Sequence, residues 1–104
     1  MRLSCRRGPG PPRALDLIHF RYGEMLLTMG QPERAAREFL AATMVSGAEA
    51  ATVSRAHLRA AQSYDLAGKR NEALNEYRIV LSRPNVFDSY DQAHRGQREP
   101  YRRN

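Results

Sequence analysis

Three histidines and one cysteine are the side chains of this chain best suited to bind a metal or transfer a proton. His19 and His57 lie 38 residues apart, and His94 lies in a polar stretch near the C-terminus. A zinc ion needs ligands that converge within a few ångström, whereas the first two histidines fall at matching positions of an internal repeat. We therefore expect packing roles for His19 and His57, and neither a metal nor a cofactor.

No catalytic constellation stands out from the sequence. The single cysteine, Cys5, cannot form an internal disulfide. A nucleophile elbow, a phosphate-cradling glycine loop and a spaced carboxylate pair are all missing. The sequence therefore predicts a protein that is not an enzyme.

The formal net charge of +6 is confined to the two ends of the chain. Residues 1–13 carry four arginines and no acidic residue, and residues 95–104 carry four arginines and one glutamate, whereas residues 14–94 have a net charge of −1. Such ends, with Tyr101 among the arginines, could contact phosphates and stack on a base. The alternative function is thus a nucleic-acid-associated protein that binds through its tails. Basic ends are more often solubilising segments, so we do not expect nucleic acid to be the main partner.

No apolar run approaches the length of a membrane span. The first residues include arginines but no apolar stretch behind them, unlike a secretory signal. We therefore expect a cytoplasmic protein without membrane contact.

Apolar residues recur at three- and four-residue steps through the middle of the chain, the spacing of one face of a helix. Gly30 and Gly68 end two of the expected helices, and Pro32 and Pro84 mark a start and a stop. No stretch alternates in the manner of a strand, so we expect an all-α fold. The expected inner residues are Leu15, Ile18, Tyr22, Leu26 and Met29 in the first helix, Ala35, Phe39 and Ala42 in the second, Val53, Ala56, Ala60, Ala61, Tyr64 and Ala67 in the third, and Ala73, Leu74, Tyr77 and Val80 in the fourth.

These signals divide the chain into three parts. Residues 1–13 form a basic tail rich in glycine and proline, for which we expect no regular structure. Residues 14–99 form the helical domain, with repeats at about 16–49 and 54–87 and a short capping helix at about 89–98. Residues 100–104 form a second basic tail.

The repeat is visible when the chain is aligned with itself at a shift of 38 residues. His19 to Thr43 then align with His57 to Leu81, with five identities. In both halves a glycine is followed by an alanine five residues later and an aromatic four residues after that, a recurrence that indicates a repeated helical hairpin. The identical pairs are His19 and His57, Arg21 and Arg59, Gly30 and Gly68, Ala35 and Ala73, and Glu38 and Glu76.

This pattern resembles the tetratricopeptide repeat over about residues 16–87. In that family the first helix of each hairpin carries a bulky residue, a small pair and an aromatic, and the second carries alanine, an aromatic and alanine. Two departures are the histidines, which replace a large aromatic, and the spacing of 38 rather than 34 residues. The matching positions are Tyr22-Gly23, Leu26, Gly30, Ala35, Phe39 and Ala42, then Ala60-Ala61, Tyr64, Gly68, Ala73 and Tyr77.

The resemblance implies a non-catalytic adaptor or scaffold that binds a protein or peptide on the inner face of its first-type helices. Arg21, Arg55 and Arg59 resemble part of the clamp by which some members hold a terminal carboxylate, so an acidic peptide is the expected ligand. The clamp's asparagine positions hold Glu24 and Gln62, and Glu24 is placed to pair with Arg21. An ordinary solvated helix face is the competing interpretation. The expected binding residues are Phe20, Arg21, Glu24, Arg55, Leu58, Arg59 and Gln62.

Two repeats are fewer than the three or so that usually form a stable stack. Apolar residues such as Leu15, Ile18 and Val86-Phe87 would lie at the open ends of the array. We therefore expect the chain to associate with itself or to dock on a partner.

Overall fold

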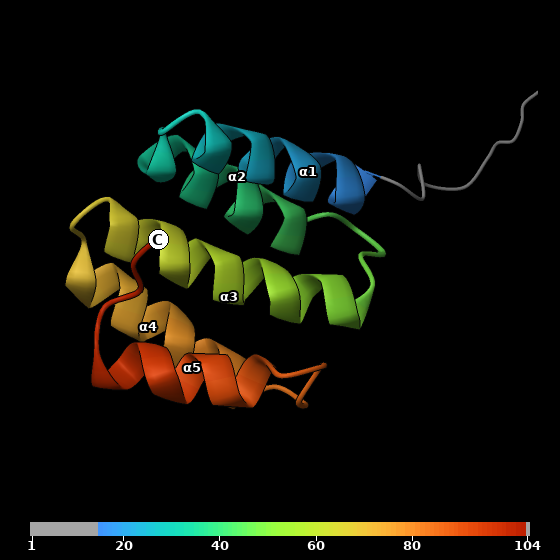
Figure 1. The fold of residues 1–104 in the computed structure, drawn as a ribbon. Coiled ribbons are helices and arrows are strands. Elements are labelled where there is room, and N and C mark those ends of the chain that lie inside the picture. The colour runs from blue at the N-terminus through green and yellow to red at the C-terminus, as the bar shows by residue number, and fades with distance from the viewer. Residues whose placement is uncertain (1–14, 104) are drawn as a thin grey trace, which may run out of the picture.

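A computed structural model describes residues 15–103 of the chain. They form five α-helices and no β-strand (Figure 1). The all-α class predicted from the sequence is confirmed. The predicted N-terminal tail, residues 1–13, lies outside the described residues. The helices are α1 (Leu15–Thr28), α2 (Pro32–Thr43), α3 (Ala50–Leu66), α4 (Arg70–Leu81) and α5 (Ser89–Arg98).

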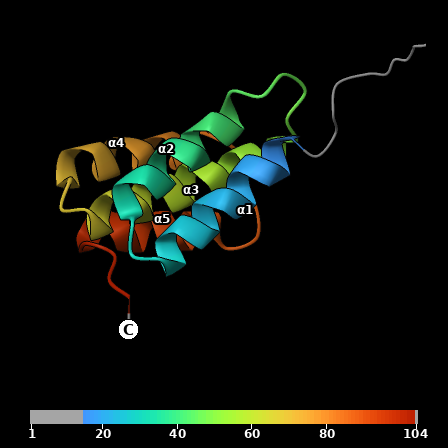
Figure 2. The same ribbon diagram turned by 90° about the horizontal axis from the view of Figure 1, so that it is seen from above.

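The helices pack in chain order, each against the next, and α3 also contacts α1 and α5. Figure 1 shows α1 and α2 together, α3 in the middle, and α4 and α5 together on its other side. Seen from above in Figure 2, α2 and α4 lie on the side away from the C-terminus. We call the surface formed by α1, α3 and α5, over which the C-terminus lies, the front face. None of the helices within residues 15–103 is both long and apolar enough to cross a membrane.

The two glycines that were expected to end helices do so in the same way. Gly30 and Gly68 both have φ of 77°, in the left-handed region that favours glycine. In each turn the glycine amide donates to the carbonyl three residues back, and the next amide donates to the carbonyl five residues back, at 2.8 to 3.1 Å. This is the Schellman arrangement, and it connects α1 to α2 and α3 to α4 by turns of the same geometry.

One aromatic ring lies at the centre of each half of the core. Phe39 of α2 and Tyr77 of α4, 38 residues apart in sequence, are both fully buried. The ring of Phe39 covers Gly23 of α1, and the ring of Tyr77 covers Gly96 of α5. A β-carbon at either glycine would lie within 2.9 Å of ring atoms, so the absence of a side chain lets these helices approach. Ala35, Ala42, Ala73 and Val80, the other expected inner residues of α2 and α4 with full burial, surround the rings.

The expected inner line of α1 is wrong at three positions. Ile18 and Met29 are each 58% exposed, and Tyr22 is 38% exposed. Because α1 is the first described helix and packs only on α2 and α3, it buries one side and leaves an apolar line uncovered on the other. The buried residues of α1 are Asp16, Phe20, Gly23, Leu26 and Leu27.

The contact between Tyr77 and Gly96 gives a direct test of the packing. A β-carbon at position 96 would lie 2.2–2.6 Å from Tyr77 ring and hydroxyl atoms, and Tyr77 is fully buried and cannot move aside. We expect Gly96→Ala to lower the free energy of unfolding by about 1–3 kcal/mol, although alanine is the better helix former. Thermal unfolding followed by circular dichroism measures the change. Gln97→Ala, at the exposed neighbour, is the control and should change it little; a more stable Gly96→Ala variant would contradict the packing.

Candidate functional site

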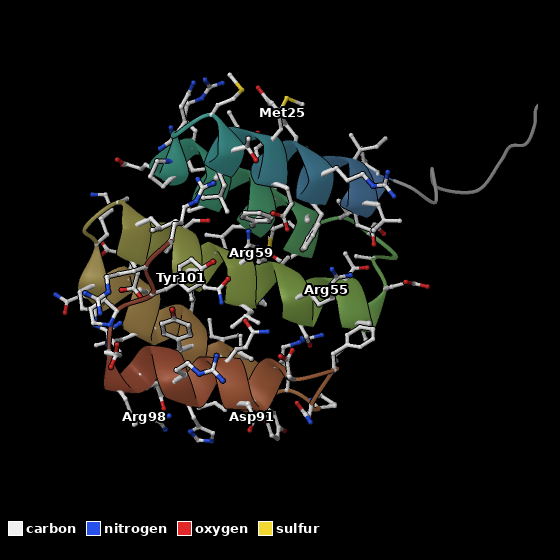
Figure 3. All side chains as sticks on the ribbon, in the orientation of Figure 1. Met25, Arg55, Arg59, Asp91, Arg98 and Tyr101 are labelled. Carbon is white, nitrogen blue, oxygen red and sulfur yellow. The ribbon has the colours of Figure 1, made fainter. Side chains whose placement is uncertain are left out.

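The residues predicted to bind a ligand lie on two helices of the front face. Phe20, Arg21 and Glu24 belong to α1, and Arg55, Leu58, Arg59 and Gln62 belong to α3. In Figure 3, Arg55 and Arg59 lie along α3, and Tyr101 of the C-terminal segment lies in front of the same helix. The structure brings six of the seven residues into contact with one another or around a shared pocket.

Arg59 is the centre of a polar chain across the front face. Its Nε and Nη2 atoms donate to the two carboxylate oxygens of Glu24 at 3.1 and 2.8 Å, and its Nη1 atom donates to Gln62 at 2.6 Å. The side-chain amide of Gln62, which is only 3% exposed, donates to Gln92 of α5 at 3.0 Å. This series of hydrogen bonds therefore links α1, α3 and α5.

The charge of Arg59 is matched within the protein. Burial disfavours the charged guanidinium, but the hydrogen bond and negative charge of Glu24, with a contribution from Tyr101, outweigh burial and raise the pKa of Arg59 above its ordinary value. Three of its five N–H donors already have acceptors, and a carboxylate from a ligand would compete with Glu24 for two of them. Arg59 therefore links α1 to α3 through Glu24, and its charge is not free for a ligand.

Arg55 has a different environment, between two aromatic rings. Its guanidinium carbon lies 5.0 Å from the centre of the Phe20 ring and 5.8 Å from that of Phe87, within the range of cation–π attraction. Phe87 is 80% exposed and has φ of 56°, a conformation that costs energy for a residue with a side chain.

A pocket of about 400 Å³ lies beside Arg55, between α3, the loop before α5 and α5 itself. Its walls include the predicted residues Arg55, Leu58, Arg59 and Gln62. Leu58 is 6% exposed and belongs to the core as well as to the pocket wall. The residues added to the predicted set are Val86, Phe87, Asp88, Ser89 and Gln92.

Arg21 lies apart from the rest of the predicted set. It is exposed on α1 and lines neither this pocket nor the second one described below. The expected pairing of Arg21 with Glu24 is not found, because Glu24 reaches across to Arg59 instead. Phe20, another predicted ligand residue, is 6% exposed, and its ring packs edge-on against Phe39 at 5.1 Å, so it supports Arg55 from beneath.

A buried carboxylate lies at the other end of α3. The side chain of Asp65 is 1% exposed and accepts from Arg70 at both oxygens, at 3.0 Å each. The hydroxyl of Tyr77 donates to it at 2.8 Å. Burial and this hydrogen bond to a negative partner raise the pKa of Tyr77 well above its ordinary value, so the hydroxyl stays protonated as a donor.

The segment after α5 completes the group around Asp65. The backbone amide of Tyr101 donates to Asp65 at 3.0 Å, and the Arg103 guanidinium donates to the carbonyl of Leu27 near the end of α1. Residues 100–103, expected to be part of a basic tail, pass in front of α3 in Figure 1 and contact the helices through Tyr101 and Arg103. The sequence did not foresee these contacts because they join positions 36 and 76 residues apart.

A second pocket, of about 510 Å³, lies between this segment and the front face. Gln62 and Gln92 line it as they line the first pocket. The two pockets therefore adjoin along α3 and α5, with the polar chain of Arg59 between the Arg55 end and the Asp65 end. The remaining lining residues are Tyr77, Arg95, Gly96, Glu99, Pro100, Tyr101, Arg102 and Arg103.

His19 and His57 are more than packing positions. The Nδ1 atom of His19 lies 2.8 Å from a carboxylate oxygen of Glu38, and that of His57 lies 2.6 Å from one of Glu76. The second pair is the more buried, with side chains 15% and 9% exposed against 33% and 27%. Each bond joins the two helices of one hairpin. In the part of the chain that the structure describes, no three histidine, cysteine, aspartate or glutamate side chains are placed to hold a metal ion.

Sequence reasoning missed Phe87, Gln92, Tyr101 and Arg103 as parts of this surface. The histidine–glutamate bonds had a usable signal, because both residue types recur at the 38-residue shift and are 19 residues apart in each repeat. Phe87 and Gln92 lie outside the two segments that align at this shift, residues 19–43 and 57–81, and carry no such signal.

No protein-family model, no curated protein and no solved structure matches this chain.

The histidine–glutamate bonds can be tested by substitution. We expect His57→Phe to lower the free energy of unfolding by about 1–3 kcal/mol, because it leaves the carboxylate of Glu76, 9% exposed, without its partner. His19→Phe should cost less, since water can reach Glu38, 27% exposed. Urea denaturation of both variants measures the difference.

A second substitution serves as the control. Glu76→Leu in the His57→Phe background removes the buried carboxylate and should recover part of the loss. If His57→Phe alone were as stable as the parent, the bond would contribute nothing and the packing interpretation from the sequence would hold.

Proposed function

We propose that this chain is a non-catalytic module that binds a protein or peptide on its front face, as an adaptor or assembly scaffold. The observation that carries the proposal is Arg55, set between Phe20 and the exposed Phe87 beside a pocket of about 400 Å³. Strained backbone and exposed aromatic side chains are characteristic of recognition surfaces. We propose that the module acts in the cytoplasm.

We also propose that the helical hairpins are of tetratricopeptide type. Support comes from two features that recur at the 38-residue shift and match the family's pattern: the glycine turns, and the buried rings of Phe39 and Tyr77. In that family the first-type helices form the ligand surface, which corresponds here to α1, α3 and α5.

The proposed ligand group at the Arg55 pocket is a carboxylate of an acidic peptide. Arg59 has its carboxylate partner in Glu24. Arg55 instead contacts two aromatic rings and forms no ion pair with any other described residue. Arginine donates two parallel hydrogen bonds to a carboxylate, and partial shielding by Phe87 strengthens them. Arg55 is therefore the residue proposed to select the ligand.

Photo-crosslinking tests whether this face meets a partner. With p-benzoylphenylalanine in place of Phe87, we expect a discrete crosslinked partner from cells that make the chain. The same group in place of Met44, which is 82% exposed and lines neither pocket, should give none. Equal crosslinking at both positions would contradict a specific front-face partner.

Arginine substitutions test the ligand chemistry with that partner in hand. We expect Arg55→Ala to weaken its affinity about tenfold or more, because a charge-assisted hydrogen bond contributes about 1.5–3 kcal/mol and 1.4 kcal/mol is a factor of ten. Arg21→Ala, an exposed arginine outside both pockets, is the matched control and should bind as the parent does. Isothermal titration calorimetry measures both, and equal affinities for parent and Arg55→Ala would contradict the proposal.

The alternative, nucleic-acid association through arginine-rich tails, gains no support from the described residues. Of the side chains that it would use, Arg103 donates to the Leu27 carbonyl. Protein or peptide binding is therefore the function we put forward.

We further propose that the chain associates with a second copy through the uncovered side of α1. Ile18, Tyr22, Met25 and Met29 recur at helical spacing on this side, and three of them are more than half exposed. Open ends of stacked hairpins commonly carry such apolar surface and need a cover. Met25 points outward from α1 in Figure 3.

Light scattering tests this association. We expect the parent to be dimeric or larger at high micromolar concentration, and Ile18→Glu with Met25→Glu to have the mass of a single chain. Met44→Glu, at an exposed methionine after α2, should behave as the parent. A parent with the mass of one chain at every concentration would exclude the proposal.

A further inference from the structure

The C-terminal segment binds the front face in the way a peptide ligand would. Residues 99–103 form no helix or strand, and follow α5. The Tyr101 amide donates to Asp65 of α3 and the Arg103 guanidinium donates to Leu27 of α1, so the segment spans from α5 across α3 to α1. Main-chain hydrogen bonds together with a side-chain anchor are the usual contacts of an extended bound peptide.

The surface beneath the segment suits a positively charged peptide. Leu27 and Asp65 both lie in the last turn of their helices, the end at which the helix dipole is negative. The Asp65 carboxylate adds full negative charge, although Arg70 offsets it. An arginine that reaches this end of the front face finds an acceptor in the Leu27 carbonyl, which Arg103 uses.

Two neighbouring arginines of the segment differ sharply in their contacts. Arg103 donates to the Leu27 carbonyl, whereas the side chain of Arg102 is 81% exposed and lies 3.6 Å from an oxygen of Glu99, itself 68% exposed. General attraction between basic residues and the face would treat the two alike. Their difference indicates a specific binding position for one arginine, two residues after the Tyr101 amide.

We propose that Glu99–Arg103 is an intramolecular ligand of the front face, and that this end of the face takes extended, arginine-bearing peptides that must displace it. The inference rests on the proposed function in one respect, since the covered surface adjoins the pocket assigned to a partner. The bound segment weakens the apparent affinity for such a peptide: the intrinsic association constant is multiplied by the fraction of chains in which the segment is released.

The experiment uses the full chain and a fluorescent synthetic peptide with the sequence of residues 97–104. Two variants release the segment by different means. Arg103→Ala removes the donor to Leu27, and Tyr101→Pro removes the amide hydrogen that is donated to Asp65. Arg98→Ala is the control, with the same loss of charge at an exposed residue of α5 that lines neither pocket. Fluorescence polarisation gives peptide affinity, and ¹⁵N relaxation of residues 102 and 103 reports whether the segment is held.

We expect order parameters of the segment like those of the helices in the parent and in Arg98→Ala, and lower order parameters in Arg103→Ala. The combined Arg103→Ala and Tyr101→Pro variant should bind the peptide about tenfold more tightly than the parent, if the segment is bound in about nine chains of ten. Arg98→Ala should bind the peptide as the parent does. Circular dichroism checks that the helices are intact in each variant.

Three results would overturn the inference: free motion of the segment in the parent, equal peptide affinity in parent and combined variant, or no binding of the peptide to any variant. None of them bears on the crosslinking at position 87, which tests the proposed function separately. If a partner crosslinks at position 87 but the segment moves freely in the parent, the proposed binding function is supported and the intramolecular ligand is excluded.

Discussion

The buried carboxylate of Asp65 is the interaction on which the C-terminal half of the structure depends. A carboxylate that is 1% exposed is costly unless its lone pairs are occupied, and here Arg70, the Tyr77 hydroxyl and the Tyr101 amide occupy them. The bond to Tyr77 fixes the ring that covers Gly96, and so determines how closely α5 approaches. The same carboxylate therefore positions the last helix and the segment that follows it.

The repeat keeps polar partners as well as apolar ones. At the 38-residue shift the fold reuses a left-handed glycine turn, a fully buried aromatic ring and a histidine–glutamate bond between the helices of each hairpin. A buried ring constrains distance but tolerates rotation, whereas a hydrogen bond at 2.6–2.8 Å restricts how one helix turns against the other. The second hairpin, with its more buried bond, lies at the centre of the array, where α3 has neighbours on both sides.

The helices could be predicted because their signals are local. Gly30, Gly68 and the three- and four-residue spacing of apolar residues act within one or two turns of chain. The facing of α1 could not be predicted in the same way: it carries apolar residues on two sides, and which side is buried depends on which helices lie beside it. Most of the site residues on α1 and α3 were identified through the repeat, but Phe87 and Tyr101 belong to irregular segments, whose positions only long-range contacts determine.

The front face is polarised along α3. Arg55 and Asp65 are ten residues apart on this helix, about 15 Å at 1.5 Å per residue, a distance that an extended peptide covers in about five residues. One end presents a cation between aromatic rings, and the other presents a carboxylate and helix carbonyls that hold Tyr101 and Arg103. The intramolecular segment occupies the second end and leaves the pocket beside Arg55 open. An acidic group can therefore enter at Arg55 while the segment is in place, but a peptide long enough to use both ends must first displace it.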